Sequence, residues 1–222
     1  MDDELRAQAR AFADQTSELL NGTLTNGIRI SPVVTPDGST LMGCGVTRTS
    51  PDPRPIPLGA KRRVWLYLLH SYGWDPEGEY LTMTRSTLSL YTSESMEDRE
   101  LVVGMDYIRE PANKYPGCHL HVHGGRDDLD HIYLGDARDS RKLRDLHLPV
   151  GGKRFRPTLE DLVEFVVTEE MAKPHDGWDD VVAEHRRRWQ EIQLKAAVRR
   201  QQDVAAEALQ AAGWTLTPPA AT

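Results

Sequence analysis

The start of the chain alternates apolar and polar residues with the period of an α-helix. Apolar side chains recur at steps of three and four from Leu5 through Phe12 to Leu19, with charged residues between them. This spacing places the apolar residues on one side of a helix. Asn21-Gly22 is a common helix end. The pattern predicts an amphipathic helix over residues 2 to 20.

After this helix the pattern changes to the shorter period of β-strands. Thr23 to Thr49 contains an alternating segment, the turn sequence Pro36-Asp37-Gly38 and a glycine-rich return. These features predict a hairpin. Ser50 to Gly59 carries four prolines, which cannot continue the interior of a sheet. We expect that segment to be a surface connection.

Five further segments have the composition of strands. They are short, rich in branched and aromatic residues, and separated by polar or glycine-containing stretches. The predicted strands are residues 64–69, 81–91, 101–108, 118–123 and 146–150.

Two helices are predicted after the last strand. Thr158-Leu159-Glu160-Asp161 has a hydroxyl at the N-cap position and an acid three residues later, which favours a helix over residues 158 to 172. A second start signal lies at Asp176 to Asp179, and no breaker follows until Gly213. A helix of up to about 35 residues, roughly 50 Å long, is implied. Its alanine-rich second half either projects towards a partner or bends back over the sheet.

These elements predict an α+β fold, with a mainly antiparallel sheet of about six or seven strands and flanking helices. We expect one α+β domain over residues 1–175, a long C-terminal helix over 176–213 and a tail over 214–222.

The charge, the first residues and the cysteines exclude several classes of protein for this chain. The 222 residues carry a net charge of -7, which argues against bulk electrostatic binding of nucleic acid. The acidic start does not resemble a secretory signal, and no apolar run is long enough to span a membrane. Cys44 and Cys118 have no zinc-type spacing. We therefore expect a cytoplasmic protein, bacterial in type, without a membrane segment.

The sharpest chemical feature is a strand in which histidines alternate with other residues. In the sequence from Cys118 to Gly125, His119, His121 and His123 share one face if the segment is extended. Histidine titrates near neutral pH, which suits proton transfer. The acids and the histidine that follow have no spacing typical of a metal site, so we expect acid-base or phosphate-binding work without a metal or cofactor. A metal-binding protein that uses the same histidines is a third, weaker option. The alternative is a solvated sheet face on which the three rings make contacts only with water and with the backbone.

A second feature is a cluster of cations before a predicted helix N-terminus. Lys153, Arg154 and Arg156 follow Gly151-Gly152, and such a loop favours phosphate or another anion. The alternative is a surface loop whose cations pair with Glu160 and Asp161. Similarly, the arginines at 186–188 are expected to lie on a solvated face, balanced by nearby acids such as Glu184 and Glu191. The alternative is an RNA-binding stripe. No serine-hydrolase elbow, P-loop or dinucleotide-binding motif is present.

Two resemblances to known families follow from these residues. The segment His119 to Gly125, with Asn113 and Gly117 upstream, resembles the motif of the histidine-triad nucleotide hydrolases. This resemblance implies that His121 is a nucleophile towards an α-phosphate. The order of strands, the segment 115–122 and the helix 157–165 resemble the TumE-like toxins of bacterial toxin-antitoxin pairs. That resemblance implies action on RNA or a nucleotide, and neutralisation by an antitoxin.

The sequence therefore predicts a toxin-like hydrolase or ribonuclease directed at phosphoesters or nucleotides. His119 and His121 would do acid-base or nucleophilic work, His123 would assist, and the three cations would hold phosphate. A partner, either an antitoxin or a second copy, would bind the C-terminal helix. The alternative is a non-catalytic interaction protein that acts through this helix.

Overall fold

A computed structural model describes residues 3–35, 38–61, 64–75, 78, 80–112, 116–124, 148–150 and 156–217. The chain divides into two compact units, Met1–Val182 and Ala183–Thr222. The first unit is an α+β structure built on an antiparallel sheet, as predicted from the sequence.

The sheet runs in the order β1-β2-β4-β5-β6-β7-β8, with β3 paired to β4. All described pairings are antiparallel. Only one described partner strand lies beside each of β1, β3 and β8. The strands are β1 (Ile30–Val34), β2 (Thr40–Cys44), β3 (Ile56–Leu58), β4 (Val64–Trp74), β5 (Leu81–Tyr91), β6 (Leu101–Ile108), β7 (Cys118–Val122) and β8 (Leu148–Pro149).

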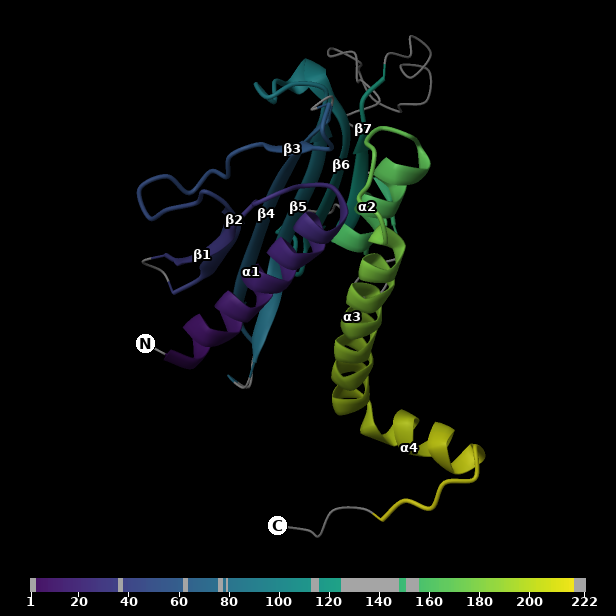
Figure 1. The fold of residues 1–222 in the computed structure, drawn as a ribbon. Helices are drawn as coiled ribbons and strands as arrows, with labels where there is room; N and C mark the ends of the chain where they lie inside the picture. The colour runs from purple at the N-terminus through teal and green to yellow at the C-terminus, as the bar shows by residue number, and fades with distance from the viewer. Residues whose placement is uncertain are drawn as a thin grey trace, which may run out of the picture. The chain divides into compact units, whose positions relative to one another are not determined.

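Two helices cover one face of this sheet (Figure 1). The first is α1 (Asp3–Thr23), which extends slightly beyond the predicted end at Asn21-Gly22, and the second is α2 (Leu159–Thr168). The predicted N-cap is confirmed, because Thr158 and Asp161 form a reciprocal capping box. The apolar faces of both helices join the inward-facing strand residues in one core.

Strict alternation along β4 separates the two faces of the sheet. Val64, Leu66 and Leu68 are buried under the helices, while the residues between them are half-buried on the other side. Because successive strand residues point in opposite directions, the register extends this division across β5, β6 and β7. The face opposite α1 and α2 carries Asp106, His119 and His121.

Two sequence predictions need correction. β4 continues to Trp74 instead of ending at Leu69, because Tyr72 is buried in the core and β5 pairs with the whole length. The segment from Ser50 to Gly59 is not only a connection, since Ile56 and Leu58 are buried and form β3. Proline lacks the N–H that a strand between two neighbours needs, and β3 can contain Pro57 because it has one described partner strand.

The predicted C-terminal helix is long but interrupted. α3 (Trp178–Arg200) has 23 residues, fewer than the 35 or so predicted, and α4 (Gln202–Ala211) follows after a break at Gln201. The backbone of Gln201 has φ -139° and ψ 59°, outside the helical region. No breaker residue marks this position in the sequence. Among the described residues, no helix is long and apolar enough to cross a membrane.

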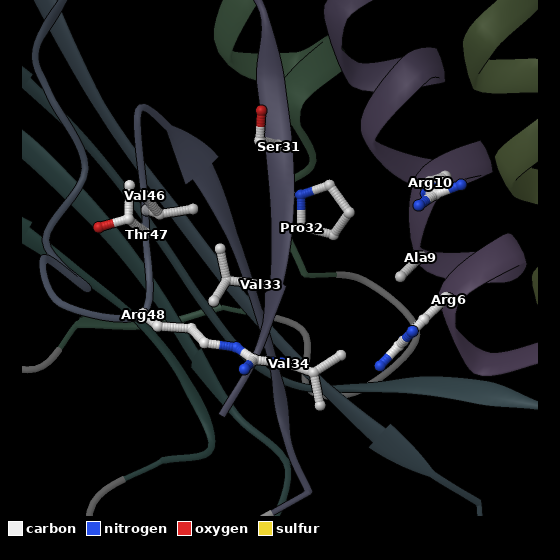
Figure 2. Close-up of a pocket in the computed structure, with 10 residues that line it drawn as sticks. All are labelled: Arg6, Ala9, Arg10, Ser31, Pro32, Val33, Val34, Val46, Thr47 and Arg48. Atoms are coloured by element: carbon white, nitrogen blue, oxygen red, sulfur yellow. The ribbon is translucent and has the colours of Figure 1, made fainter. Parts of the chain in front are cut away.

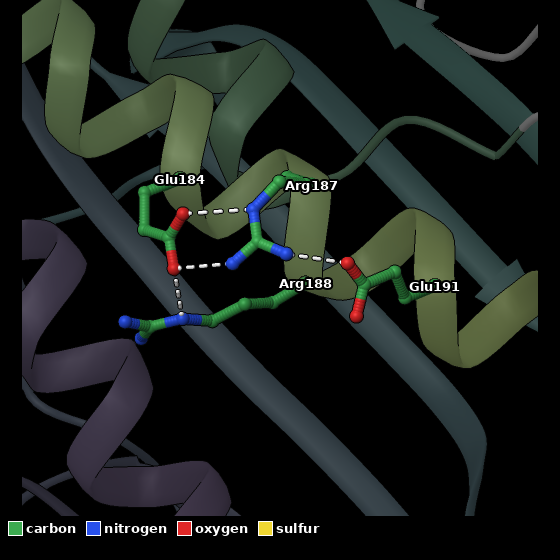
Figure 3. Close-up of polar contacts among 4 residues, drawn as sticks. All are labelled: Glu184, Arg187, Arg188 and Glu191. Carbon is green, nitrogen blue, oxygen red and sulfur yellow. Dashed lines mark hydrogen bonds and ion pairs between the residues drawn. The ribbon is translucent and has the colours of Figure 1, made fainter.

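Two arginines of α3, Arg187 and Arg188, are balanced by acids on the same helix, as expected (Figure 3). Glu184 accepts hydrogen bonds from Arg187 and from Arg188, and Arg187 also pairs with Glu191. These hydrogen bonds lower the pKa of Glu184 to about 2. The pairing supports a solvated helix face at these positions, as opposed to an arginine stripe free for nucleic acid.

Candidate functional site

The pairing of β6 with β7 brings the histidine strand beside an acid that the sequence analysis did not select. His119 lies opposite Asp106, and His121 lies opposite Gly104. His119 and His121 share one face of the strand, as predicted, while Cys118 faces the helix-covered side. Asp106 projects on the same side as the two histidines because it lies directly across from His119.

The two imidazoles converge on one carboxylate oxygen. Asp106 Oδ2 lies 3.5 Å from His121 Nε2 and 4.0 Å from His119 Nε2. The two rings pack edge to face, with centroids 4.9 Å apart. His119 is buried, and the side chains of Asp106 and His121 are 26% and 21% exposed. We call Asp106, His119 and His121 the Asp-His-His cluster.

A backbone contact fixes the orientation of His119. Its Nδ1 atom lies 2.8 Å from the carbonyl oxygen of Pro116. A carbonyl oxygen can only accept a hydrogen bond, so Nδ1 must carry the hydrogen. In a neutral ring Nε2 then carries the lone pair, and this atom faces Asp106.

His123 lies just after the strand and outside the cluster. Its backbone N–H donates to the carbonyl of Val102, at 3.1 Å. Its Nδ1 atom is buried and has no hydrogen-bond partner in the described part of the chain. The structure therefore brings together two of the three predicted catalytic histidines.

The environment of Asp106 favours its charged form. Burial raises the pKa of this carboxyl, but the close approach of His121 and Thr87, with the charges of His121 and His119, outweighs burial and lowers the pKa overall. Asp106 Oδ1 is buried and makes no hydrogen bond of ordinary geometry within the described ranges. One oxygen of the carboxylate thus faces the histidines.

The cluster contains donor atoms of the types that bind metal ions. Two imidazole nitrogens and one carboxylate oxygen lie within 4.8 Å of one another. Cys118 does not contribute, because its thiol is on the opposite face, where burial raises its pKa to about 11. The acids and the histidine considered as further ligands, Asp127, Asp128, Asp130 and His131, lie outside the described residues.

Aromatic residues occupy the same face beside the cluster. Trp65 pairs across the sheet with Tyr91, and Tyr67 is two positions further along β4. All three side chains are half-buried. Burial raises the pKa of Tyr67 and Tyr91, and Asp106 contributes to both shifts. The two phenols therefore lie within electrostatic range of the cluster.

Arg156, one of the predicted phosphate-binding residues, does not join the cluster. Arg156 lies with its guanidinium carbon 4.6 Å from the centre of the Tyr107 ring, on the helix-covered face. Burial lowers the pKa of Arg156. Lys153 and Arg154 lie outside the described residues. Consecutive sheet residues alternate in direction, so Tyr107 and Asp106 point to opposite faces, and Arg156 is separated from the histidines by the sheet.

A pocket elsewhere on the first unit shares no residue with the cluster (Figure 2). It lies between α1, β1 and the segment after β2. Three of its lining residues are the arginines Arg6, Arg10 and Arg48.

Comparison with known proteins gives no relative: no family model matches the chain, and no curated protein or solved structure matches it significantly. The site therefore has to be interpreted from its own geometry. Asp106 is the residue that sequence reasoning missed, because its partners are set by strand register and are 13 and 15 positions away along the chain. The only sequence signal was an acid at an outward position of a predicted strand.

Proposed function

We propose that this chain is a hydrolase of phosphoester bonds in nucleotides or RNA, and that the Asp-His-His cluster is its centre. The observation that carries this proposal is the convergence of two imidazole nitrogens on one carboxylate oxygen. These groups meet on the sheet face opposite α1 and α2.

The cluster combines the groups that hydrolysis of a phosphoester requires. Water supplies the oxygen that forms the new bond to phosphorus, the bond to the leaving oxygen breaks, and the proton from water passes to the leaving group. A carboxylate beside two imidazoles can orient the attacking water and balance charge at the phosphorus. The fixed position of His119 reduces the reorganisation that this chemistry would need.

The aromatic residues beside the cluster support a substrate that contains a planar ring. Trp65, Tyr67 and Tyr91 lie on β4 and β5, and the cluster lies on β6 and β7. Adjacent strands are about 4.8 Å apart, so a phosphate at the cluster would place an attached base over β5 or β4. Stacking of a base on an aromatic side chain contributes about 1–3 kcal/mol. A nucleotide fits this arrangement better than a simple alkyl phosphate.

A cation on the same face can contribute to phosphate binding. Arg85 is exposed and lies on β5 two positions from Thr87, which pairs with Asp106. This placement favours Arg85 over Arg156 for the phosphate role that we propose. The net charge of -7 is compatible with a short substrate that is held locally.

The first experiment is the growth of a bacterial host during induced expression of the chain. Wild type is compared with Asp106→Asn and His121→Ala. Cys118→Ala is the matched control, because this residue is on the same strand but faces the other side. We expect arrest with wild type and with the control, and normal growth with the two cluster variants at equal soluble yield. RNA and nucleotide pools from arrested cells would then identify the substrate.

Normal growth with every variant would remove the toxin part of the proposal. Hydrolysis would then be tested with purified protein on mononucleotides and on single-stranded RNA. Equal activity of wild type and Asp106→Asn on both substrates would contradict the assignment of the centre.

A second function is supported by a separate observation, the apolar surface of the C-terminal unit. Six large apolar side chains there are 41% to 65% exposed: Ile192, Leu194, Val198, Val204, Leu209 and Trp214. Exposed apolar residues gathered in one segment are typical of a partner surface. We propose that this unit binds an antitoxin or a second copy.

Deletion of residues 190–212 separates the two functions. An interaction protein would lose its effect with this deletion and keep it with His121→Ala. An enzyme would show the reverse in an assay with purified substrate.

A further inference from the structure

We propose that the Asp-His-His cluster binds one divalent transition-metal ion. This inference rests on the same residues as the proposed function, but it does not depend on hydrolase activity. A bound ion would be the resident cofactor of the centre, whereas the sequence favoured acid-base work without a metal and left a metal-binding protein as the weaker option.

The separations of the donor atoms fit an ion with a small adjustment. Zn²⁺ and similar ions bind nitrogen and oxygen at about 2.0–2.2 Å, so two ligands of one ion are roughly 3–3.6 Å apart. Asp106 Oδ2 is already 3.5 Å from His121 Nε2 and 4.0 Å from His119 Nε2. The full set of donors lies within 4.8 Å. Closing the widest separation requires a movement of about 1 Å, which side-chain rotation supplies.

The hydrogen bonding of His119 also favours an ion. Because Nδ1 donates to the carbonyl of Pro116, a neutral ring presents its Nε2 lone pair to the carboxylate. A backbone carbonyl that holds the far nitrogen of a histidine is a common arrangement around metal ligands.

The charges of the donor set suit a divalent ion. The two imidazoles would each supply a nitrogen lone pair, and the negative charge of Asp106, whose Oδ2 atom faces both rings, would partly balance the charge of the ion.

The donor set indicates the class of ion. Two imidazoles and one carboxylate suit Zn²⁺, Co²⁺, Ni²⁺, Mn²⁺ or Fe²⁺, whereas Mg²⁺ and Ca²⁺ prefer oxygen ligands. Three protein ligands leave coordination positions open for water or for a phosphate oxygen. The ion would therefore lie where a substrate on this sheet face could contact it.

The test is direct binding to the purified full chain after treatment with a chelator. Zn²⁺ is titrated by calorimetry, and Co²⁺ is followed by its visible absorption bands. We expect one ion per chain and binding more than about tenfold weaker in Asp106→Asn, His119→Ala and His121→Ala. Cys118→Ala is the control and should bind like wild type, because its thiol faces the helices.

Circular dichroism of each variant ensures that lost binding does not reflect lost folding, and Asp106→Asn is the mildest change. Absence of micromolar binding in wild type, or equal binding in all cluster variants, would overturn the inference. Hydrolysis without bound ion would leave the proposed function standing and remove the metal site. Binding without hydrolysis of any nucleotide or RNA would do the opposite.

Discussion

The two faces of the central sheet are built from the same strands but have different contents. On the covered face, Leu66, Leu68, Leu88 and Leu90 are almost fully buried beneath α1 and α2. The opposite face carries the Asp-His-His cluster and three aromatic side chains. Because side chains alternate along a strand, a segment such as Cys118–Val122 serves both faces at once. Stability and chemistry are therefore encoded at alternate positions, and substitutions can address them separately.

The largest expected effect is a loss of activity when a residue of the Asp-His-His cluster is replaced. Asp106→Asn should lower the rate of phosphoester hydrolysis by about 10²–10⁴-fold, the usual contribution of a positioned catalytic group. The free energy of unfolding should change by less than about 1 kcal/mol, because Asp106 is not in the apolar core. Steady-state kinetics and urea unfolding of the same preparations measure both. A large loss of stability in this variant would blur the division between the faces.

On the covered face, a substitution should mainly lower the free energy of unfolding. Leu68→Ala removes a side chain that is 0% exposed and should lower the free energy of unfolding by about 2–5 kcal/mol. The neighbouring substitution, Leu69→Ala, is the matched control, since Leu69 points to the other face and is half-buried. We expect a clearly smaller loss for the control, measured by urea unfolding. Equal losses would mean that the second face is as tightly packed as the core.

A pH dependence should arise from the polar part of the covered face. His70, Ser86, Tyr107 and Cys118 are opposite one another on successive strands, and all are buried. Burial, with the charge of Arg156, lowers the pKa of His70 from 6.5 to about 3. Between these values the unfolded chain binds a proton that the folded chain does not. Stability therefore falls as the pH decreases through this range.

The slope from His70 alone should approach about 1.4 kcal/mol per pH unit. Urea unfolding at several pH values, for wild type and His70→Gln, isolates this contribution from that of other groups. A variant with the same slope as wild type would show that His70 is protonated in the folded protein.

The smallest expected effect is a loss of stability at the start of α2, one of the two helices that cover the sheet. Thr158→Ala removes the capping box at the start of α2 and should cost about 1 kcal/mol, seen as a lower Tm. Metal binding by the cluster should not change, because the cap is on the covered side. Thr158→Ser keeps the hydroxyl and should restore most of the loss. Weaker metal binding in Thr158→Ala would reveal coupling between the faces.

The sequence was informative where local patterns decide the structure. The bounds of β5 and β6 match the predicted segments 81–91 and 101–108, because period-two alternation and flanking polar residues define them locally. The shared face of His119 and His121 followed from the same alternation. The start of α2 was readable from its capping residues.

Features that depend on the pairing of distant segments could not be predicted from the sequence. Asp106 joins His119 only through the register of β6 and β7, which a single sequence does not specify. Arg156 was grouped with the histidines because of its charge, although the sheet separates them. Tyr72 extends β4 because it is covered by the core, and the break at Gln201 has no glycine or proline to mark it.

The border strands of the sheet share a feature with a consequence outside the native fold. Each strand with a single described neighbour contains a proline: Pro32 in β1, Pro57 in β3 and Pro149 in β8. Proline has no N–H to offer an incoming strand, so each border is a poor template for strand addition by another chain. We expect these prolines to limit edge-to-edge polymerisation and amyloid-like aggregation through the described border strands, and replacement of Pro32 by threonine to weaken this effect.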